Sequence, residues 1–158
     1  MSIDPDLFRS ILGRFACGIT VVTVRDAHGH DHGMTISAFS SVSLEPPLVL
    51  FCVANDATMA TVMSTATSFG VSILSDTEEP QSRRFSGKTD DRFADLQYTR
   101  GSLGNALLSD ALATIDCRVT ARYPAGDHVI VIGEVESGGA RDARPLLYYR
   151  GGYAQLER

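Results

Sequence analysis

The sequence has almost no lysine and no excess of basic charge. Lys88 is its only lysine, and the formal net charge is −5 at pH 7. A protein that binds the phosphate backbone of nucleic acid needs a concentrated basic face, so nucleic acid is excluded as a partner. No apolar run approaches the roughly 18 residues that a membrane span needs. The N-terminal MSIDPDLFRS also lacks the features of a signal peptide, so we expect a cytoplasmic protein that does not enter membranes.

Cysteine is also scarce. Cys17, Cys52 and Cys117 are odd in number and far apart, so they indicate neither a set of disulfides nor a CxxC metal site. Their apolar neighbours predict small residues of the core. Hydrophobic residues make up 44% of the 158 residues, and we expect a single domain over residues 1–158.

The pattern of apolar residues predicts strands with a few helices between them. Asp4 is a candidate N-cap for an amphipathic helix that starts at a proline and ends at Gly18. Further helices are expected over 55–67, capped by Asn55 or Asp56, and over 76–85. Strands are expected over 19–24, 34–44, 48–54, 68–74, 111–123 and 128–137, with two short pieces after residue 145. The strand over 48–54 is apolar throughout, which predicts burial on both faces. These elements suggest a closed or nearly closed antiparallel barrel with helices over its openings.

Three histidines occupy alternate positions in the segment AHGHDHG. On a strand, His28, His30 and His32 would point to one side, where they could bind zinc. The glycines at 29 and 33 and the polar residues around them instead predict an exposed hairpin tip, and no cysteine or carboxylate cluster elsewhere completes a site. We therefore expect a turn and no functional metal.

The segment after this turn combines hydroxyl side chains with small residues. Its hydroxyl residues are Thr35, Ser37, Ser40, Ser41 and Ser43. Small residues let the backbone approach a ligand while the hydroxyls donate hydrogen bonds to its oxygens. A half-exposed strand whose serines face water would have the same composition, so composition leaves both interpretations open.

Six segments, in this order, resemble those of a known family: GRFACGITVVTV, HGMTISAFSSVSLEPPLVLFCVA, SFGVSILS, RRFSGKTDDRF, AGDHVIVIGEV and PLLYYRGGY. The most specific patterns are TxSAFSSVSLxPP and GDHxIxxGEV. From about Leu7 to the C-terminus, the chain is similar to the flavin reductase-like family of small NAD(P)H:flavin oxidoreductases.

The resemblance implies a mainly β fold with some α structure: an FMN-binding split β-barrel with Greek-key antiparallel strands and two or three covering helices. It further implies a homodimer in which NADH or NADPH transfers hydride to FMN or FAD near the subunit boundary. The reduced flavin would then pass to a partner, the flavin-dependent monooxygenase component. A non-catalytic flavin carrier or redox sensor on the same barrel is the alternative, and a metal-binding histidine loop is a second one.

The same resemblance implies roles for particular residues. The contacts to the flavin ring edge and ribityl chain would come from Thr35, Ile36, Ser37, Ser40 and Ser41. The ribityl chain and phosphate would lie against Cys52, Val53, Ala54, Asn55 and Thr58, where relatives carry a serine in place of Ala57. The phosphate or adenine end would be covered by Phe85, Ser86, Gly87 and Lys88.

The last three implied site residues would lie beside the nicotinamide. His128 would position the ring without reacting covalently, and Tyr148 and Tyr149 would approach the same pocket. In the alternative interpretation, Asp127 and His128 only end a hairpin. Next to Arg83 and Arg84, Lys88 would form a positive patch suited to phosphate, although a solvated arginine pair fits the same residues.

Overall fold

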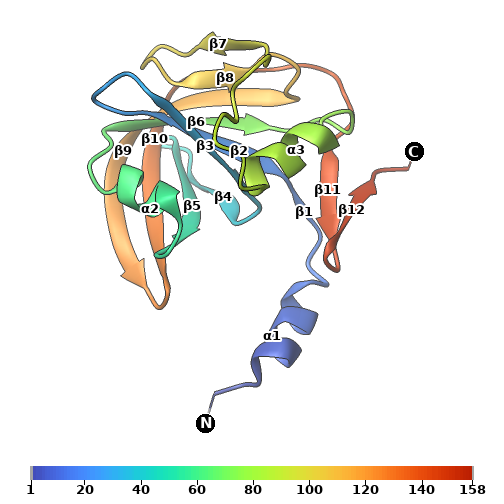
Figure 1. Cartoon of the computed structure of the whole chain (residues 1–158). Helices are drawn as coiled ribbons and strands as arrows, with labels where there is room; N and C mark the ends of the chain where they lie inside the picture. Colours follow the sequence, from blue (N-terminus) through green and yellow to red (C-terminus); the bar gives the residue numbers. More distant parts are fainter. Residues whose placement is uncertain (1, 158) are drawn as a thin grey trace.

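An antiparallel sheet of seven strands dominates the computed structural model, which describes residues 2–157 (Figure 1). The order across the sheet is β3-β2-β6-β9-β10-β5-β4. Its strands are β2 (Thr20–Arg25), β3 (Asp31–Ile36), β4 (Phe39–Ser43), β5 (Leu48–Ala54), β6 (Ser68–Ile73), β9 (Ala113–Ala125) and β10 (His128–Ala140). The chain passes from β5 to β6 across two intervening strands, as in a Greek key. The predicted mainly β, antiparallel fold is confirmed.

The two edge strands of this sheet are neighbours in the sequence. β3 ends at Ile36 and β4 begins at Phe39, yet they lie at opposite edges of the strand order. Only residues 37–38 connect them, so the sheet must curl until its edges meet there. The edges are not hydrogen-bonded to each other, which leaves the barrel split. The single strand predicted over 34–44 is therefore two strands with a bend between them.

Two smaller sheets complete the β structure. One has the order β1-β11-β12 and consists of β1 (Cys17–Gly18), β11 (Leu146–Tyr149) and β12 (Gly152–Gln155). The other is the hairpin of β7 (Tyr98–Arg100) and β8 (Ala106–Leu108). The two predicted tail strands are confirmed. The hairpin lies in a stretch without a clear apolar pattern and was not predicted.

Three helices accompany the sheets. α1 (Pro5–Leu12) begins as predicted after Asp4, whose carboxylate accepts hydrogen bonds from the N–H groups of Asp6 and Leu7, but it ends at Gly13 instead of Gly18. α2 (Thr58–Met63) is capped by Ala57 without a side-chain hydrogen bond, so the prediction of Asn55 or Asp56 as cap is wrong. α3 (Glu79–Ser86) confirms the helix predicted over 76–85, but it begins three residues later and ends one residue later. No helix within residues 2–157 has both the length and the apolar character to cross a membrane.

The core has two parts on either side of β2. Val22 and Val24 face the barrel interior with Phe51 and Phe69, whose rings pack edge to face with centroids 4.9 Å apart. Val21 faces the second cluster, which lies under α3. Cys117 is buried as predicted, whereas Cys17 and Cys52 are only half-buried.

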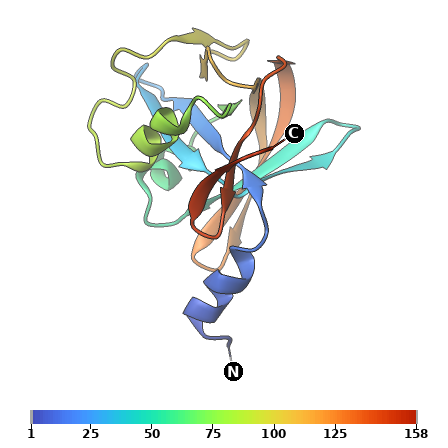
Figure 2. The same cartoon turned by 90° about the vertical axis from the view of Figure 1, so that its right-hand side faces the viewer.

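The outer face of β5 is not fully buried, contrary to the prediction. Along β5, buried and half-buried residues alternate. Leu50 and Cys52 lie on the half-buried face, opposite Ile132 and Ile130 of β10, which are also half-buried. An apolar sheet face thus lies at the surface of the chain. In Figure 2 the β4–β5 hairpin points away from α2 and α3, and α1 extends away from the body.

Candidate functional site

A groove lies between β3, the start of α2, the end of α3 and the loop that follows α3. Its volume is about 610 Å³. Five of the predicted cofactor residues line it, namely Thr35, Thr58, Phe85, Ser86 and Lys88. The structure therefore gathers side chains that are more than fifty positions apart in the sequence.

Close packing of α3 on β3 forms one wall of this groove. A Cβ atom at Gly33 would lie 2.5 Å from the ring of Phe85, so only glycine allows the helix to come this near. The hydroxyl of Thr35 donates to the carbonyl of Ser82 in α3 at 2.6 Å. Because the Phe85 side chain is fully buried, it supports the wall from behind.

Arginines fasten the loop after α3. Arg92 donates to the carbonyls of Gly33 and Gly87 at 2.7 and 2.6 Å. Arg84 donates to the carbonyl of Ala94. Arg83 pairs with Glu79 at 2.6 Å and stacks on the Tyr153 ring. These guanidinium groups serve the protein itself, so Lys88 is the part of the predicted positive patch that is left for a ligand.

The charge of the groove is predominantly negative. Asp31 lies on its rim and is paired with Arg100 at 2.5 Å. Asp56, Asp90 and Asp91 also line the groove and form no ion pair within residues 2–157. A ligand with more than one phosphate group would meet this negative field, and Lys88 is the one cation among the described groove residues that is left to bind it.

The split between β3 and β4 lies next to the groove. Its backbone is held by two hydrogen bonds, from Phe39 N–H to the Ser37 carbonyl at 2.9 Å and from Cys52 N–H to the Ala38 carbonyl at 3.0 Å. The Ser37 side chain is exposed and lies near Cys17, whose thiol donates to the Tyr148 carbonyl at 3.9 Å. Burial raises the pKa of the Cys17 thiol, which keeps it protonated.

His128 lies at the start of β10, beside the end of β5. It is the register partner of Ala54, and the N–H of Asn55 donates to the Asp127 carbonyl at 2.9 Å. Its Nδ1 lies 2.7 Å from the Asp127 carboxylate. That hydrogen bond holds the pKa of Asp127 below its usual range. Because a carboxylate can only accept, Nδ1 carries the proton and Nε2 is left for a ligand.

The β1-β11-β12 sheet brings Tyr148 and Tyr149 to the region of Cys17 and Ser37. Tyr148 is the register partner of Cys17, which places it beside Ser37. Its ring packs edge to face on Tyr153 at 5.7 Å, and the Tyr153 hydroxyl lies 2.8 Å from the hydroxyl of Ser82 in α3. Tyr148 and Tyr149 are themselves exposed, so both are accessible to a ligand or to another chain.

Some predicted residues present only backbone to this region. The side chains of Ile36 and Val53 are buried in the barrel core and have no route to a ligand. Ser40 and Ser41 lie on the exposed edge strand β4, and the Ser40 hydroxyl donates to the Ser41 carbonyl. If Ile36 or Val53 contacts a ligand, it must do so through its N–H and C=O groups.

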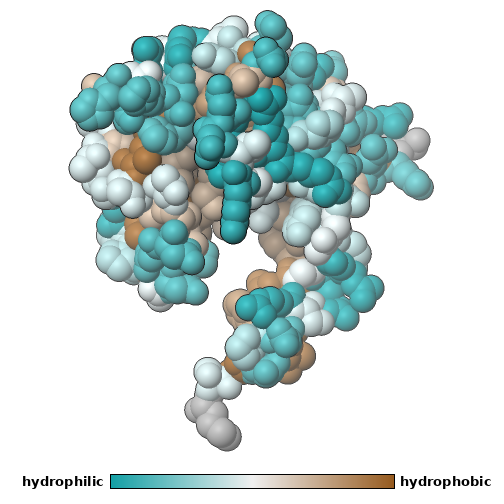
Figure 3. All heavy atoms as spheres, in the orientation of Figure 1, coloured by the Kyte–Doolittle hydropathy of each residue, from teal (hydrophilic) through white to brown (hydrophobic). Residues whose placement is uncertain are grey.

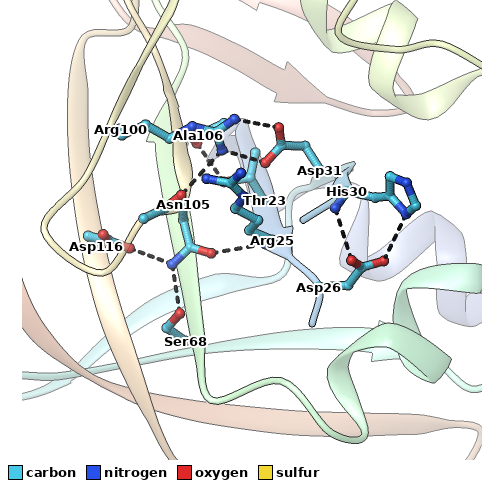
Figure 4. Close-up of polar contacts among 11 residues, drawn as sticks. Thr23, Arg25, Asp26, His30, Asp31, Ser68, Arg100, Asn105, Ala106 and Asp116 are labelled. Atoms are coloured by element: carbon cyan, nitrogen blue, oxygen red, sulfur yellow. Dashed lines mark hydrogen bonds and ion pairs between the residues drawn. The ribbon is translucent and has the colours of Figure 1, made fainter. Parts of the chain in front are cut away.

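Sequence reasoning did not assign several groove residues. They are Asp31, His32, Met34, Met59, Arg92 and Phe93. His32 was included in the predicted turn, but β3 already begins at Asp31, so its side chain belongs to the strand. Figure 4 shows two of the contacts near it, those of Asp26 with His30 and of Asp31 with Arg100. Asp31, Gly33 and Thr35 occupy alternate positions of the strand and so share one face. This pattern is the sequence signal that could have located the β3 wall of the groove.

The histidines do not converge on a metal site. No group of three or more histidine, cysteine or acidic side chains within residues 2–157 has the arrangement to hold a metal ion. The imidazoles of His28 and His30 lie 6.4 Å apart in the loop. In their place, a single carboxylate, that of Asp26, organises the turn.

Comparisons with known proteins agree with this geometry. A family model described as a flavin reductase-like domain matches residues 12–157. The chain is 41% identical over 157 residues to the flavin reductase (NADH) of Kitasatospora aureofaciens, covering 97% of this chain and 82% of that protein. It is 37% identical to the reductase subunit HsaB of a flavin-dependent monooxygenase of Rhodococcus jostii, covering 99% of this chain and 80% of that protein.

A solved structure extends the likeness to three dimensions. The NADH:FAD oxidoreductase of Streptomyces globisporus, in complex with NAD and FAD fragments, superimposes with a TM-score of 0.92 at 33% identity. The match covers 99% of this chain and 97% of that one. The similarity therefore includes the groove, the split and the tail sheet together.

Proposed function

The chain belongs to the flavin reductase-like family, and we propose that its chemistry takes place at the split between β3 and β4. The chain is an NAD(P)H-dependent flavin reductase of the kind that serves two-component monooxygenases. The observation that carries the placement is that β5 contacts both candidates' segments: the N–H of Cys52 donates to the Ala38 carbonyl, next to Ser37, and Ala54 is the register partner of His128.

The residues at the split fit a flavin. Its wall contains the small residues Ser37, Ala38 and Ala54, which leave room for a flat ring. The exposed hydroxyl and backbone groups there can bond to the ring edge and ribityl chain. We assign the ring to this wall and the phosphate to Thr58 and the Lys88 ammonium. The ring and ribityl chain are common to FMN and FAD, so we expect both flavins to be reduced.

The protein's own part in the reaction is positioning. When bound, the flavin supplies the ring that accepts hydride from a reduced nicotinamide. His128, its proton held on Nδ1 by Asp127, offers Nε2 to the nicotinamide carboxamide. Tyr148 and Tyr149 exclude water from the open side of the ring. Alignment of this kind lowers the barrier without a protein nucleophile.

We further propose that NADH is preferred to NADPH. If the adenosine half of the nucleotide lies in the groove, the 2′-phosphate of NADPH would face Asp56, Asp90 and Asp91, because the Lys88 ammonium already binds the flavin phosphate. The repulsion raises the KM for NADPH above that for NADH. Replacing Asp90 and Asp91 by asparagine should narrow this difference while leaving the KM for NADH nearly unchanged.

We also propose a homodimer, in which the partner copy covers the apolar surfaces of this chain. α1 has no buried residue, and its apolar side chains Leu7, Phe8, Ile11 and Leu12 are each about half exposed (Figure 3). Together with the outer face of β5 and β10, this makes an apolar surface that a stable monomer rarely leaves open. The reduced flavin would then pass to a monooxygenase component.

Anaerobic titration with NADH tests the reductase assignment and its place in the fold. The absorbance of FMN or FAD near 450 nm should fall with the wild type, whereas a flavin carrier would leave it unchanged. Ser37→Tyr should fill the split and abolish flavin binding. Its matched control is Ser109→Tyr, at an exposed turn position after β8, which should bind flavin normally. Normal flavin binding by Ser37→Tyr would remove the split from the site.

A further inference from the structure

Asp26 is fixed in place by the turn that contains the three histidines. Its Oδ1 accepts hydrogen bonds from the N–H groups of His28 and His30, both at 2.9 Å. Its Oδ2 lies 2.9 Å from Nε2 of His32 and 3.7 Å from Nδ1 of His30. The backbone therefore orients the carboxylate, and the carboxylate in turn orients the His32 ring.

This arrangement decides which nitrogen of His32 carries a proton. The hydrogen bond from His32, with those from the backbone, holds the pKa of Asp26 well below its usual range, so its carboxylate is ionised near neutral pH. An ionised carboxylate only accepts hydrogen bonds, so the proton is on Nε2. In the neutral ring Nδ1 is then an acceptor, on a half-buried side chain that lines the groove.

The other polar groups on the same wall are already engaged. The Thr35 hydroxyl donates to Ser82, and Arg92 donates to two backbone carbonyls. The Asp31 carboxylate accepts both of its short bonds from Arg100, at 2.5 and 2.7 Å. Nδ1 of His32 is thus the oriented acceptor that β3 leaves for a ligand in the groove.

The chemistry of this acceptor selects the part of a nucleotide that it binds. A phosphate has acceptor oxygens only and suits the Lys88 ammonium, which also lines the groove. A ribose hydroxyl is a neutral donor, and a negatively charged groove does not repel it. We propose that His32, oriented by Asp26, binds a ribose hydroxyl of the adenosine half of NADH, a role that rests on the proposed function of the groove.

Steady-state kinetics with FMN as the flavin tests this role, because FMN contains no adenosine. His32→Ala should raise the KM for NADH about three- to tenfold, the value of one hydrogen bond, and change kcat less than about twofold. His32→Asn places an amide oxygen near the position of Nδ1 and should restore part of the affinity. Asp26→Asn should raise the KM for NADH because the ring loses its fixed orientation.

His30 provides the matched control. Its imidazole belongs to the same loop and the same carboxylate, but it is 77% exposed and does not line the groove. His30→Ala should keep the KM for NADH within about twofold of the wild type. Equal KM values for His32→Ala and His30→Ala would overturn the role of His32. Thermal unfolding of each variant shows whether the barrel is intact, and a folded His32→Asn keeps the comparison valid if His32→Ala unfolds.

Binding of AMP separates the role of His32 from that of the groove. AMP should compete with NADH in the wild type and bind about three- to tenfold more weakly to His32→Ala. If AMP binds both proteins equally, the role of His32 is overturned and the groove assignment stands. If AMP fails to compete in the wild type while FMN is still reduced, the groove assignment is overturned too. If His32→Ala raises the KM for FAD but not that for NADH, His32 binds the adenosine of FAD, which contradicts the inference for NADH.

Discussion

Two carboxylate–histidine pairs in this protein have related geometries and different surroundings. Asp127 holds Nδ1 of His128 at 2.7 Å, and Asp26 holds Nε2 of His32 at 2.9 Å. Asp127 is largely exposed at a hairpin tip, whereas Asp26 is anchored by two backbone N–H groups. In each pair the carboxylate accepts a hydrogen bond from one ring nitrogen and so determines which nitrogen remains free for a ligand. A binding role requires such a free nitrogen in a fixed orientation.

His128→Ala should raise the KM for NADH about three- to tenfold and lower kcat less, because the residue is assigned to positioning in the ground state. Its control is His28→Ala, because His28 is an exposed histidine of the loop between β2 and β3. Steady-state kinetics of both variants measures the difference. A large fall in kcat with an unchanged KM would instead assign His128 to the chemical step.

Glu78 makes stability depend on pH. It is buried, and its carboxylate accepts hydrogen bonds from the N–H and hydroxyl of Ser75. Burial raises the pKa of Glu78 above its ordinary value of 4.5. The folded protein thus binds this proton more tightly than the unfolded chain. The stability that it contributes is complete below pH 4.5 and is lost as the pH rises through the raised pKa.

Glu78→Gln removes this dependence while keeping an acceptor for Ser75. Relative to that of the wild type, the free energy of unfolding of the variant should increase as the pH rises from acid to neutral. Denaturant unfolding at several pH values measures it. Parallel pH profiles for the two proteins would show that Glu78 does not titrate differently on folding.

At the scale of elements, the contact between α3 and β3 forms the groove. In Gly33→Ala the new Cβ would lie 2.5 and 2.7 Å from two atoms of the buried Phe85 ring, so the helix must move. We expect a loss of about 1–3 kcal/mol in the free energy of unfolding and weaker binding of NADH. Urea denaturation and the KM for NADH measure the two effects.

Gly139→Ala is the matched control for that substitution. Gly139 lies in β10, and a Cβ there would meet no heavy atom within 4 Å. This variant should keep the stability and the KM of the wild type. If Gly33→Ala behaves like Gly139→Ala, close packing of α3 does not determine the groove.

At the scale of the whole molecule, the position of α1 leads to a prediction about the oligomeric state. The helix lies away from the barrel (Figure 1), and its apolar side chains belong to neither core cluster within residues 2–157. We expect a dimer in analytical ultracentrifugation and a monomer for Phe8→Glu. Ser10→Glu, on the same helix but at a polar position, should remain dimeric. A monomeric wild type at micromolar concentrations would contradict the homodimer.

The single domain over residues 1–158 stays a prediction at this scale. The two core clusters meet across β2, whose residues face both of them. This continuity supports one cooperative unit, for which calorimetric and van't Hoff enthalpies of unfolding should agree.

Local patterns in the sequence determined most elements, because periodicity, caps and turn residues act over a few positions. The cap of α1 by Asp4, the β9–β10 hairpin and the tail strands were all predictable in this way. The bend at residues 37–38 was not, because it follows from the order of strands that are distant in sequence. The half-exposed outer face of β5 was missed as well, since apolar composition does not distinguish a face covered by the same chain from one left at its surface.

The candidate site likewise has one part that the sequence could indicate and another that only the tertiary structure decided. The resemblance to the family indicated Ser37, His128 and the segment around Lys88 as candidates, whereas residue types alone left their roles open. Only the tertiary structure placed Thr35, Thr58 and Lys88 on one groove and joined His32 to Asp26. The physical reason is that hydrogen bonds and packing between distant segments depend on the curl of the sheet. That curl is a property of all seven strands together and is not present in any one of them.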